Sequence, residues 1–456
     1  MDNFLSALQG IGILIGGLSL LVLIHELGHF IPAKLFGMRV DKFYLFFDWP
    51  RKLWSFQYKG TEYGIGLLPL GGYVKIAGMI DESLDTDSIK KEPEPWEFRA
   101  KPVWQRMIVM VGGVTMNVIL AIAILTVTKQ QVGDTRIPFS ELKRGIYVPE
   151  DSWANEIGLK TGYVFLDFKG QQPEFVEDVA SASVFIESDA WYTIERQGQR
   201  LRIDIPNDFV NNLTEQKRKT PVLFVPRQRT TIKPAEEGPA AKMRSRDGRS
   251  LAEGDRIVQV DDAPIEYYDE LRAALKSRAG KDIRLLAVRG TNDTLQFTPH
   301  LDESAILGVY VVDSLAVVRQ TYSFFEAIPP ATAAALRIVS DNLKGFGKLF
   351  SGDIEVSKGL DGPVGIGKQY YKTVENAGWY GFWMLTAMLS MVLAFMNILP
   401  IPALDGGHLL LLAVEALKRR PLSTALTLRI QQVGMVFLLG LMAFVLFNDF
   451  FKLFVA

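Results

Sequence analysis

The sequence predicts an α-helical polytopic membrane protein with four transmembrane helices, a re-entrant β-hairpin and two inserted β-rich domains. Three observations lead to this fold class: four apolar windows of spanning length, a short Gly-rich apolar segment after the first window, and an internal repeat between the second and third windows. The chain of 456 residues has room for several compact units. Its net charge of −1 gives no sign of a polyanionic partner, so we expect no nucleic acid binding.

The four apolar windows nearly lack Asp, Glu, Lys and Arg, and roughly 20 apolar residues are enough to cross a bilayer. The first window is interrupted by Glu26 and Lys34, while the other three contain none of these residue types. A cleaved signal peptide is a weaker interpretation of the first window, because residues 1–10 carry no Lys or Arg. The windows are Phe4–Phe36, Met107–Thr128, Trp379–Leu404 and Ile430–Asn448.

Basic residues gather on two of the segments that connect these windows. Twelve Lys and Arg residues lie from Lys34 to Arg106, and four more lie from Lys418 to Arg429. Because such an excess marks cytoplasmic loops, we expect both segments in the cytoplasm, and the two termini and segment 129–378 on the opposite side. The chain has no cysteine, which excludes disulfides, thiolate metal sites and a cysteine nucleophile.

Two further segments are expected to lie against the membrane domain. Residues 61–78 (TEYGIGLLPLGGYVKIAG) are too short to span, and their β character predicts a hairpin that dips against the membrane domain and offers an open strand edge. A charged cytoplasmic loop follows it at 81–101. Beyond Pro329-Pro330, apolar residues recur at spacings of three and four, which predicts either an amphipathic helix at the membrane surface or a rigid connector.

The segment between the second and third windows contains two similar stretches 92 residues apart. In each, a glycine (Gly162 or Gly254) precedes an alternating apolar run that ends in another turn. The pattern resembles PDZ domains, more clearly in the second copy, because Tyr163 replaces the Asp that follows the glycine in the first. The resemblance implies a groove between a strand and a helix that takes up an extended peptide. The alternative is a pair of β-rich domains that only fill space above the membrane.

The first window contains an H-E-x-x-H motif at His25, Glu26 and His29. Positions i and i+4 share one face of a helix, so the two histidines can present nitrogens to one metal ion. Glu26 can reach a water on that ion, and zinc lowers the pKa of such a water to about 7. An acidic residue inside a span costs about 2.5–3.5 kcal/mol, which favours a metal site over a His–Glu pair that only ties helices together.

A catalytic zinc ion needs three protein ligands and an open position. Asp405 ends the third window at the predicted depth of the two motif histidines, which makes it the expected third ligand. His408 is its rival, because neutral imidazole also binds zinc. The alternatives are that Asp405 caps a helix beginning near Gly406 and that His408 is an interfacial polar residue. His300 is expected on the surface.

The prolines before Asp405 have a separate physical role. Pro400 and Pro402 lack backbone N–H donors and end the preceding helix, so carbonyl groups and the Asn397 side chain stay available near the metal. A water activated at such a metal site can attack a carbonyl group, as in peptide hydrolysis. A peptide bond inside a transmembrane helix is already hydrogen-bonded, so its cleavage would require local unwinding and a new partner for the exposed backbone. The open strand edge predicted at 61–78 would supply such a partner.

Together, the H-E-x-x-H motif, the N-x-x-P-x-P-x-L-D-G element, the Gly-rich hairpin and the paired PDZ-like domains resemble the site-2 protease family over nearly the whole chain. The resemblance implies an intramembrane zinc metalloprotease with one zinc ion per chain. It implies zinc binding by His25, His29 and Asp405, a general base at Glu26, and substrate contacts at Asn397, Pro400 and Pro402.

The resemblance also implies a biological setting. The substrates would be single-span membrane proteins, such as an anti-sigma factor already cut on its outer side, and remnant signal peptides, with PDZ-like domains that exclude bulky substrates. The chain would be a multi-pass protein of the bacterial inner membrane, surrounded by lipid, with its termini and PDZ-like domains periplasmic and its active site towards the cytoplasm. The expected parts are 1–128 and 379–456 (paired spans), 129–221 and 222–315 (PDZ-like domains) and 316–378 (connector).

Two functions of other classes fit some of the same residues. A transporter or channel would use the buried ionisable groups as an ion path, but it does not explain the helical spacing of the motif. A membrane-anchored scaffold would act through its PDZ-like domains, but it leaves residues 397–405 unexplained. A substitution of Glu26 would be harmless in the scaffold and would abolish cleavage in the protease.

Overall fold

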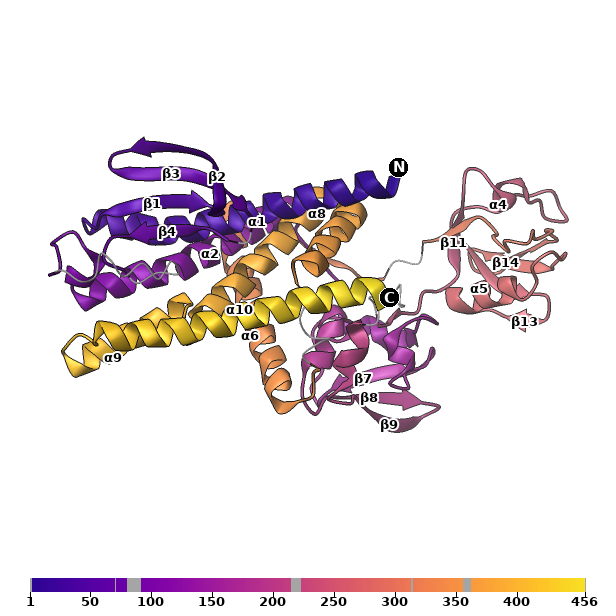
Figure 1. The fold of residues 1–456 in the computed structure, drawn as a ribbon. Coiled ribbons are helices and arrows are strands. Elements are labelled where there is room, and N and C mark those ends of the chain that lie inside the picture. The colour runs from indigo at the N-terminus through magenta and orange to yellow at the C-terminus, as the bar shows by residue number, and fades with distance from the viewer. Residues whose placement is uncertain are drawn as a thin grey trace. The chain divides into compact units, whose positions relative to one another are not determined.

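The computed structural model describes residues 2–69, 71–79, 92–214, 223–312, 315–355 and 362–455. They form two compact units. The first comprises Met1–Gly133 and Thr321–Ala456, and it combines long helices with one β-sheet (Figure 1). The second comprises Asp134–Gln320 and is rich in β-strands. Residues 81–91 of the predicted cytoplasmic loop lie outside the described residues.

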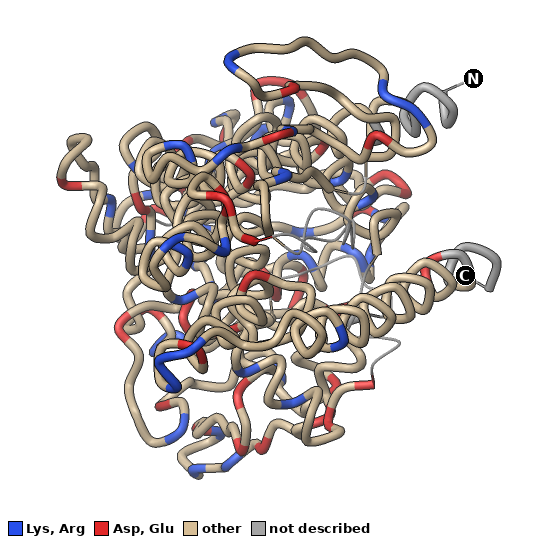
Figure 2. The backbone as a smooth tube through the Cα atoms, turned by 60° about the vertical axis from the view of Figure 1, so that its left-hand side comes forward, with Lys and Arg blue, Asp and Glu red and all other residues tan. Residues whose placement is uncertain are grey.

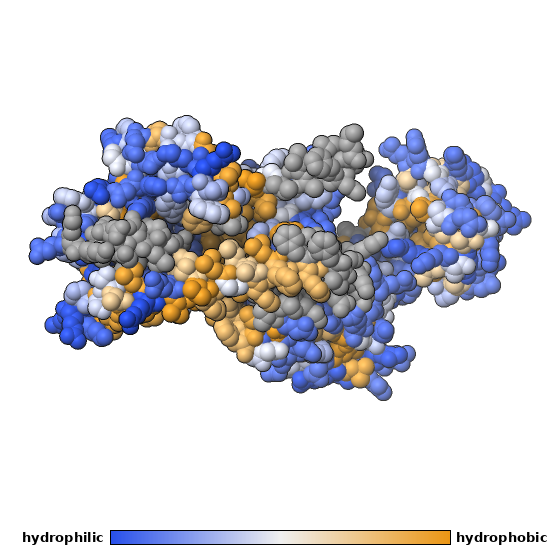
Figure 3. Space-filling view, in the orientation of Figure 1, coloured by the Kyte–Doolittle hydropathy of each residue, from blue (hydrophilic) through white to orange (hydrophobic). Residues whose placement is uncertain are grey.

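Four helices of the first unit, among the described residues, are long and apolar enough to cross a membrane. This confirms the predicted number of spans. The last of them is the least buried within the protein, with 11% of its apolar window covered, and hydrophobic side chains line it (Figure 3). The same helix is almost free of charged residues along its length (Figure 2). The four helices are α1 (Asp2–Leu35), α2 (Val103–Val132), α8 (Pro363–Ile398) and α10 (Thr424–Val455).

Helix α8 contains a sharp reversal at Gly378, where φ is 57° and ψ is −150°. Tyr370 Oη lies 3.1 Å from Thr386 Oγ1, whereas a straight helix would place two residues of this separation about 24 Å apart. The arm before Gly378 therefore folds back on the arm after it, and the apolar window that begins at Trp379 corresponds to the second arm. This arm ends at Ile398, before the predicted end at Leu404, because the prolines that follow cannot continue a helix.

The sheet of the first unit has four strands in the order β2-β3-β1-β4. Strands β3 and β4 come from the predicted hairpin at 61–78, but they do not pair with each other, because β1 lies between them. The β character of this segment is confirmed, and its predicted pairing is wrong. The hairpin is instead β2–β3, joined by a two-residue turn at Lys59-Gly60 whose φ angles are both positive. The strands are β1 (Val40–Leu45), β2 (Phe47–Tyr58), β3 (Thr61–Leu68) and β4 (Tyr73–Ile76).

Two more helices complete the first unit. Helix α6 (Phe324–Ser351) begins with a capping box formed by Ser323 and Glu326. Its buried Ala331 and Ala335 pack against small and apolar residues of α2 and α8, so α6 is a packed connector with other apolar residues left exposed. Helix α9 (Asp405–Lys418) lies between α8 and α10 and is too short to span. A single turn of 3-10 helix, η2 (Phe98–Ala100), precedes α2.

The second unit has two hydrophobic cores, one built from residues 139–224 and the other from residues 232–307. The predicted boundary at 221/222 lies outside the described residues, but Leu223 and Phe224 beyond it still belong to the first core. This is because β10 returns to pair with β6. The elements of this part of the chain are β5 (Asp134–Arg136), η3 (Phe139–Arg144), β6 (Ile146–Tyr147), η4 (Trp153–Asn155), β7 (Val164–Phe168), α3 (Glu177–Ala180), η5 (Ala182–Ile186), β8 (Trp191–Arg196), β9 (Gln199–Asp204), η6 (Phe209–Thr214) and β10 (Val225–Pro226).

The second core lies against a sheet in the order β15-β14-β12-β11-β16, with β13 paired to β12. Helix α5 contributes Leu271 and Leu275 to this core. A final strand, β17 (Val318–Gln320), pairs with β5. The other elements are β11 (Thr231–Pro234), α4 (Pro239–Lys242), β12 (Asp255–Val260), β13 (Ala263–Pro264), α5 (Tyr268–Lys276), β14 (Leu285–Arg289), β15 (Asp293–Phe297) and β16 (Val309–Val311).

The sequence repeat is also a structural repeat. Gly162 and Gly254 both have left-handed φ angles, 91° and 92°. Gly254 directly precedes β12, and one residue separates Gly162 from β7. The following strands, β7 and β12, each contain a register shift at the same offset, and each is followed by a residue with positive φ (Lys169 or Asp261). The backbone conformations of the two copies are therefore more similar to each other than their amino-acid sequences are.

Candidate metal centre

His25, His29 and Asp405 converge on one point. His25 Nε2 lies 3.2 Å from His29 Nε2 and 3.3 Å from Asp405 Oδ2, and His29 Nε2 lies 3.4 Å from the same oxygen. Ligand atoms that sit 2.0–2.1 Å from a tetrahedral zinc ion are about 3.3–3.4 Å from one another. The three side chains thus already have the mutual spacing of ligands to one zinc ion. Among the described residues, these three side chains form a group that is close enough together to hold one metal ion.

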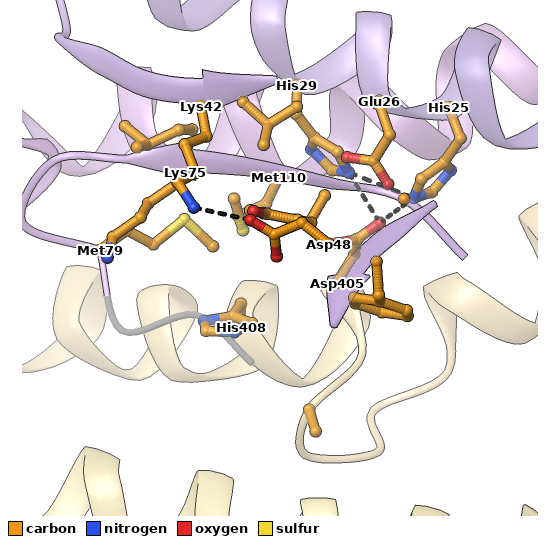
Figure 4. A pocket seen from close by; sticks show the side chains of 16 residues that line it. His25, Glu26, His29, Lys42, Asp48, Lys75, Met79, Met110, Asp405 and His408 are labelled. Carbon is orange, nitrogen blue, oxygen red and sulfur yellow. Dashed lines mark hydrogen bonds and ion pairs between the residues drawn. The ribbon is translucent and has the colours of Figure 1, made fainter. Parts of the chain in front are cut away.

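The carboxylate of Asp405 supports the same assignment. Its Oδ2 atom is buried and receives no hydrogen bond from any described residue, a costly arrangement unless a cation completes it. Helix α9 begins at Asp405, its N-cap is Leu404, and no side chain caps it. The alternative interpretation of Asp405 as a helix cap is therefore wrong. Its side chain is directed at the two histidines instead (Figure 4).

The close crossing of α1 and α2 buries the two histidines. A Cβ atom on Gly28 would lie 2.2 Å from the carbonyl oxygen of Gly112, and one on Gly113 would lie 2.4 Å from His29 Nε2. Small residues let the two backbones approach this closely. His25 and His29 are consequently only 9% and 7% exposed. Sequence reasoning missed these glycines, although the Gly112-Gly113 pair in the second apolar window was a visible signal.

Each histidine has a partner on its second ring nitrogen. His29 Nδ1 lies 2.8 Å from the carbonyl oxygen of Val109, and His25 Nδ1 lies 3.2 Å from the side-chain amide of Asn117 on α2. Because Nε2 of both rings faces the metal-binding point, Nδ1 carries the proton and donates it. Asn117 is fully buried, and its backbone oxygen accepts a hydrogen bond of 2.7 Å from Ser390 Oγ on α8.

The amide of Asn117 must present its oxygen to His25. With Nδ2 towards the ring and the ring proton on Nδ1, two donors would face each other. Oxygen and nitrogen of an amide are assigned from such networks, so rotating this amide by half a turn gives His25 Nδ1 its acceptor. Sequence reasoning did not single out Asn117. A carboxamide inside an apolar window was the available signal.

A cavity of about 310 Å³ opens beside the three side chains. Glu26 projects from α1 into it, next to both histidines (Figure 4). Strand β4 forms another wall, and a Cβ atom on the preceding Gly72 would lie 3.2 Å from Glu26 Cγ. The cavity is lined by His25, Glu26, His29, Lys42, Phe47, Asp48, Gly72, Tyr73, Val74, Lys75, Ile76, Met79, Met110, Ala403, Asp405 and His408.

An ion pair forms part of the cavity wall outside the membrane-spanning helices. Lys42 Nζ lies 2.8 Å from Asp48 Oδ2. Burial by itself would raise the pKa of Asp48, but hydrogen bonds from Lys42 and Tyr73 lower the pKa below its ordinary value. The wall near β4 therefore carries a paired carboxylate, not a neutral acid, at neutral pH.

The remaining predicted residues lie at different distances from the centre. Asn397 Nδ2 lies 3.4 Å from His25 Nε2. Pro400 is exposed and Pro402 half-buried, and neither is part of the cavity wall. His408 lines the cavity but is not part of the three-residue group. His300 is exposed, as expected, and its Nδ1 atom lies 2.8 Å from Asp282 Oδ1.

Comparison with known proteins adds a family to this geometry. The family model described as peptidase family M50 matches residues 13–441. The chain belongs to peptidase family M50. As a member of this family, the protein is a zinc metalloprotease, and the transporter and scaffold alternatives lose their support.

Similar proteins cover nearly the whole length of this family M50 chain. It is 31% identical to the regulator of sigma-E protease RseP of Escherichia coli strain K12, over 98% of this chain and 100% of the relative. It is 30% identical to RseP of Salmonella typhimurium strain 14028s, with the same coverage of both chains. A protein named putative zinc metalloprotease from Xylella fastidiosa strain 9a5c is 28% identical over 94% of this chain and 96% of the relative.

Proposed function

We propose that this protein hydrolyses peptide bonds of single-span membrane proteins within the bilayer, with His25, His29 and Asp405 as the ligands of one zinc ion. The spacing of 3.2–3.4 Å among the three ligand atoms carries this proposal. The site lies where α1 meets the start of α9, with Gly113 of α2 packed against His29, and both α1 and α2 are long and apolar enough to span. A tetrahedral zinc ion keeps a fourth position for water or substrate beyond three protein ligands.

Glu26 is the proposed general base. Zinc, when bound, supplies a water whose pKa is lowered to about 7. The Glu26 carboxylate would accept a proton from the attacking water as its oxygen bonds to the scissile carbonyl carbon, and would pass this proton to the amide nitrogen as the C–N bond breaks. Burial of Glu26 beside the two histidines keeps it within reach of the same cavity. Asn397, next to His25 Nε2, would donate a hydrogen bond to the substrate, with Pro400 and Pro402 nearby in the same turn.

Strand β4 is the proposed binding edge for the substrate backbone. β4 pairs with β1 on one side, and no described strand pairs with it on the other. Residues Gly72–Ile76 also line the cavity. A substrate helix that unwinds there could add to β4 as an extended strand, which replaces the helix hydrogen bonds that unwinding removes.

Cross-linking tests the edge-strand proposal, and the absence of native cysteine makes single-cysteine variants unambiguous. A Lys75→Cys chain should form disulfides with alternate substrate positions, because successive residues of a strand face opposite sides. Phe56→Cys on β2, at the other edge of the sheet, is the matched control and should cross-link weakly. Equal cross-linking at both positions, or a period near 3.6 in the substrate, would contradict strand addition.

The extramembrane unit is the proposed selector of substrates. Its two repeated domains would be PDZ-like. A groove lined by α5 and residues 304–310 of the second domain, and by residues 147–151 and Thr161 of the first, supports peptide binding there. A large folded ectodomain would be held away from the zinc site, whereas a substrate already trimmed on its outer side would pass. The names of the RseP relatives support an anti-sigma factor as one substrate, and remnant signal peptides are of similar size and topology.

The proposed location is the bacterial inner membrane. The distribution of Lys and Arg supports cytoplasmic positions for segments 37–102 and 405–423. The termini and residues 134–320 would then be periplasmic, and the site at Asp405 would lie towards the cytoplasmic side.

Reconstitution tests the function as a whole. Purified protein in lipid nanodiscs should cleave a trimmed single-span substrate inside its transmembrane segment, and mass spectrometry would locate the cut. The same substrate with a folded outer domain should be cut at least tenfold more slowly, and removal of zinc by a chelator should stop both reactions. Cleavage only outside the membrane segment, or undiminished cleavage in zinc-free protein, would overturn the proposal.

A further inference from the structure

The turn that delivers Asp405 to the metal centre satisfies most of its backbone N–H groups locally, but not that of Ala403. The N–H groups of Leu399, Ile401 and Leu404 bond to nearby carbonyl oxygens, whereas that of Ala403 bonds outside the turn. Residues 399–404 connect α8 to α9, and Pro400 and Pro402 contribute no backbone N–H group. The backbone of Ala403 adopts a left-handed conformation with φ of 73°, which non-glycine residues rarely take without support from their surroundings. A neighbouring element must therefore stabilise this turn.

Helix α10 provides that support through Gln431. The backbone N–H of Ala403 donates a hydrogen bond of 2.7 Å to Gln431 Oε1. The donor is a backbone N–H, so the amide orientation of Gln431 is determined: its oxygen faces Ala403. Gln431 is 3% exposed, and three residues later a Cβ atom on Gly434 would lie 2.3 Å from the carbonyl oxygen of Pro402. The backbone of α10 is thus in direct contact with the turn.

The rest of α10 makes this contact unusual. Its apolar window is 11% buried, and side chains such as Val433, Val436 and Phe437 are exposed on its surface. Gln431 Nε2 is buried and has no hydrogen-bond partner among the described residues. A buried amide with an unsatisfied donor is costly inside a bilayer. The hydrogen bond that Gln431 Oε1 accepts from Ala403 offsets part of this unfavourable free energy.

We propose that Gln431 is a positioning residue for the zinc site, because it holds Ala403 in its left-handed conformation and so places Asp405 against His25 and His29. This inference rests on the proposed role of Asp405 as a zinc ligand. Without the hydrogen bond, Ala403 would relax towards an ordinary φ angle, and the start of α9 would turn away from the two histidines. The position of α10 is thereby coupled to the affinity of the site for zinc.

Matched substitutions on adjacent residues test this role. Gln431→Leu removes the acceptor, Gln431→Glu keeps an oxygen for Ala403, and Gln432→Leu changes an exposed glutamine next to it. The measurements are the apparent zinc dissociation constant, by chelator competition, and kcat and KM on one trimmed substrate. Gln431→Leu should bind zinc about 10–100-fold more weakly, as expected for loss of a residue that orients a ligand. Its kcat should fall at subsaturating zinc with KM unchanged.

The control variants define what overturns the inference. Gln431→Glu and Gln432→Leu should both stay within about threefold of wild type in zinc affinity, a small change on the scale of ligand-orienting residues. Wild-type affinity in Gln431→Leu, or equal losses in Gln431→Leu and Gln432→Leu, would overturn the positioning role. If Asp405→Ala leaves zinc affinity unchanged, the ligand assignment fails instead, and the two failures are distinguishable.

A second variant guards against simple misfolding. Glycine accepts a φ of 73° without steric cost, so Ala403→Gly in the Gln431→Leu background should recover part of the lost zinc affinity. A misfolded protein would not regain affinity from this change. Absence of any recovery would overturn the proposed link through Ala403.

Discussion

Helix α1 and the turn between α8 and α9 face each other across the same metal-binding point but hold their ligands by different means. Helix α1 presents His25, Glu26 and His29 from one uninterrupted helix, and their relative positions follow from its period. The turn presents Asp405 after two prolines and a left-handed Ala403. The backbone of the helical side is organised by local hydrogen bonds alone, whereas the turn also needs a hydrogen bond from Ala403 to Gln431 on another helix. Substitutions on α1 and substitutions in the turn should therefore differ in their effects on activity and on zinc binding.

The largest effect is expected on the helical side, at Glu26. Glu26→Gln keeps the shape of the side chain but removes its basic oxygen, so cleavage should fall on the order of 10²–10⁴-fold. Bound zinc should stay near one ion per chain, because the three ligand atoms are unchanged. Turnover and metal content of the same preparation check this. Loss of zinc together with activity would show that Glu26 organises the site and is not only its base.

On the turn side, Asp405→Ala should remove zinc binding as well as activity, because two histidines alone are a poor zinc site. His408→Ala is the matched control, since His408 lines the same cavity but stands outside the three-residue group. It should retain its zinc. Metal analysis after dialysis distinguishes the two variants, and the opposite result would make His408 the third ligand.

A smaller effect is expected at Asn117, which orients one of the helical ligands. Asn117→Leu leaves His25 Nδ1 without an acceptor, so zinc affinity should fall about 10–100-fold. Thr115→Val on the same helix changes an exposed hydroxyl and should have no effect on zinc affinity. Chelator competition measures both. His29 has a backbone carbonyl as its partner, so no substitution has the same direct effect on that ligand.

The smallest effect is expected at the Lys42–Asp48 ion pair on the cavity wall. Lys42→Met should change the free energy of unfolding by about 1 kcal/mol or less, because both side chains are partly solvated. The depressed pKa of Asp48 means that this contribution is present at neutral pH and is lost as the pH falls below about 3.9 and through the lower folded pKa. Thermal unfolding of both proteins across this range, with zinc affinity as the control, checks it.

Much of the membrane architecture could be predicted because the signals are local. Runs of apolar residues set the four spans, and the H-E-x-x-H spacing places His25 and His29 on one helix face. Pro400 and Pro402 predict that the preceding helix, α8, ends before them. Asp405 could be paired with the histidines by its depth in the membrane, since sequence and topology together give depth. Depth in the membrane alone could not decide whether Asp405 or His408 is the third zinc ligand.

Sequence by itself determined the number of spans, the helical ligand pair and the repeat with its positive-φ glycines, because each depends on residues close together in the chain. Only the tertiary structure decided the reversal of α8, the insertion of β1 between β3 and β4, and the contacts of Asn117 and Gln431. These features join residues far apart in sequence. Their stability comes from packing and from single buried hydrogen bonds, which leave no periodic signal in the sequence.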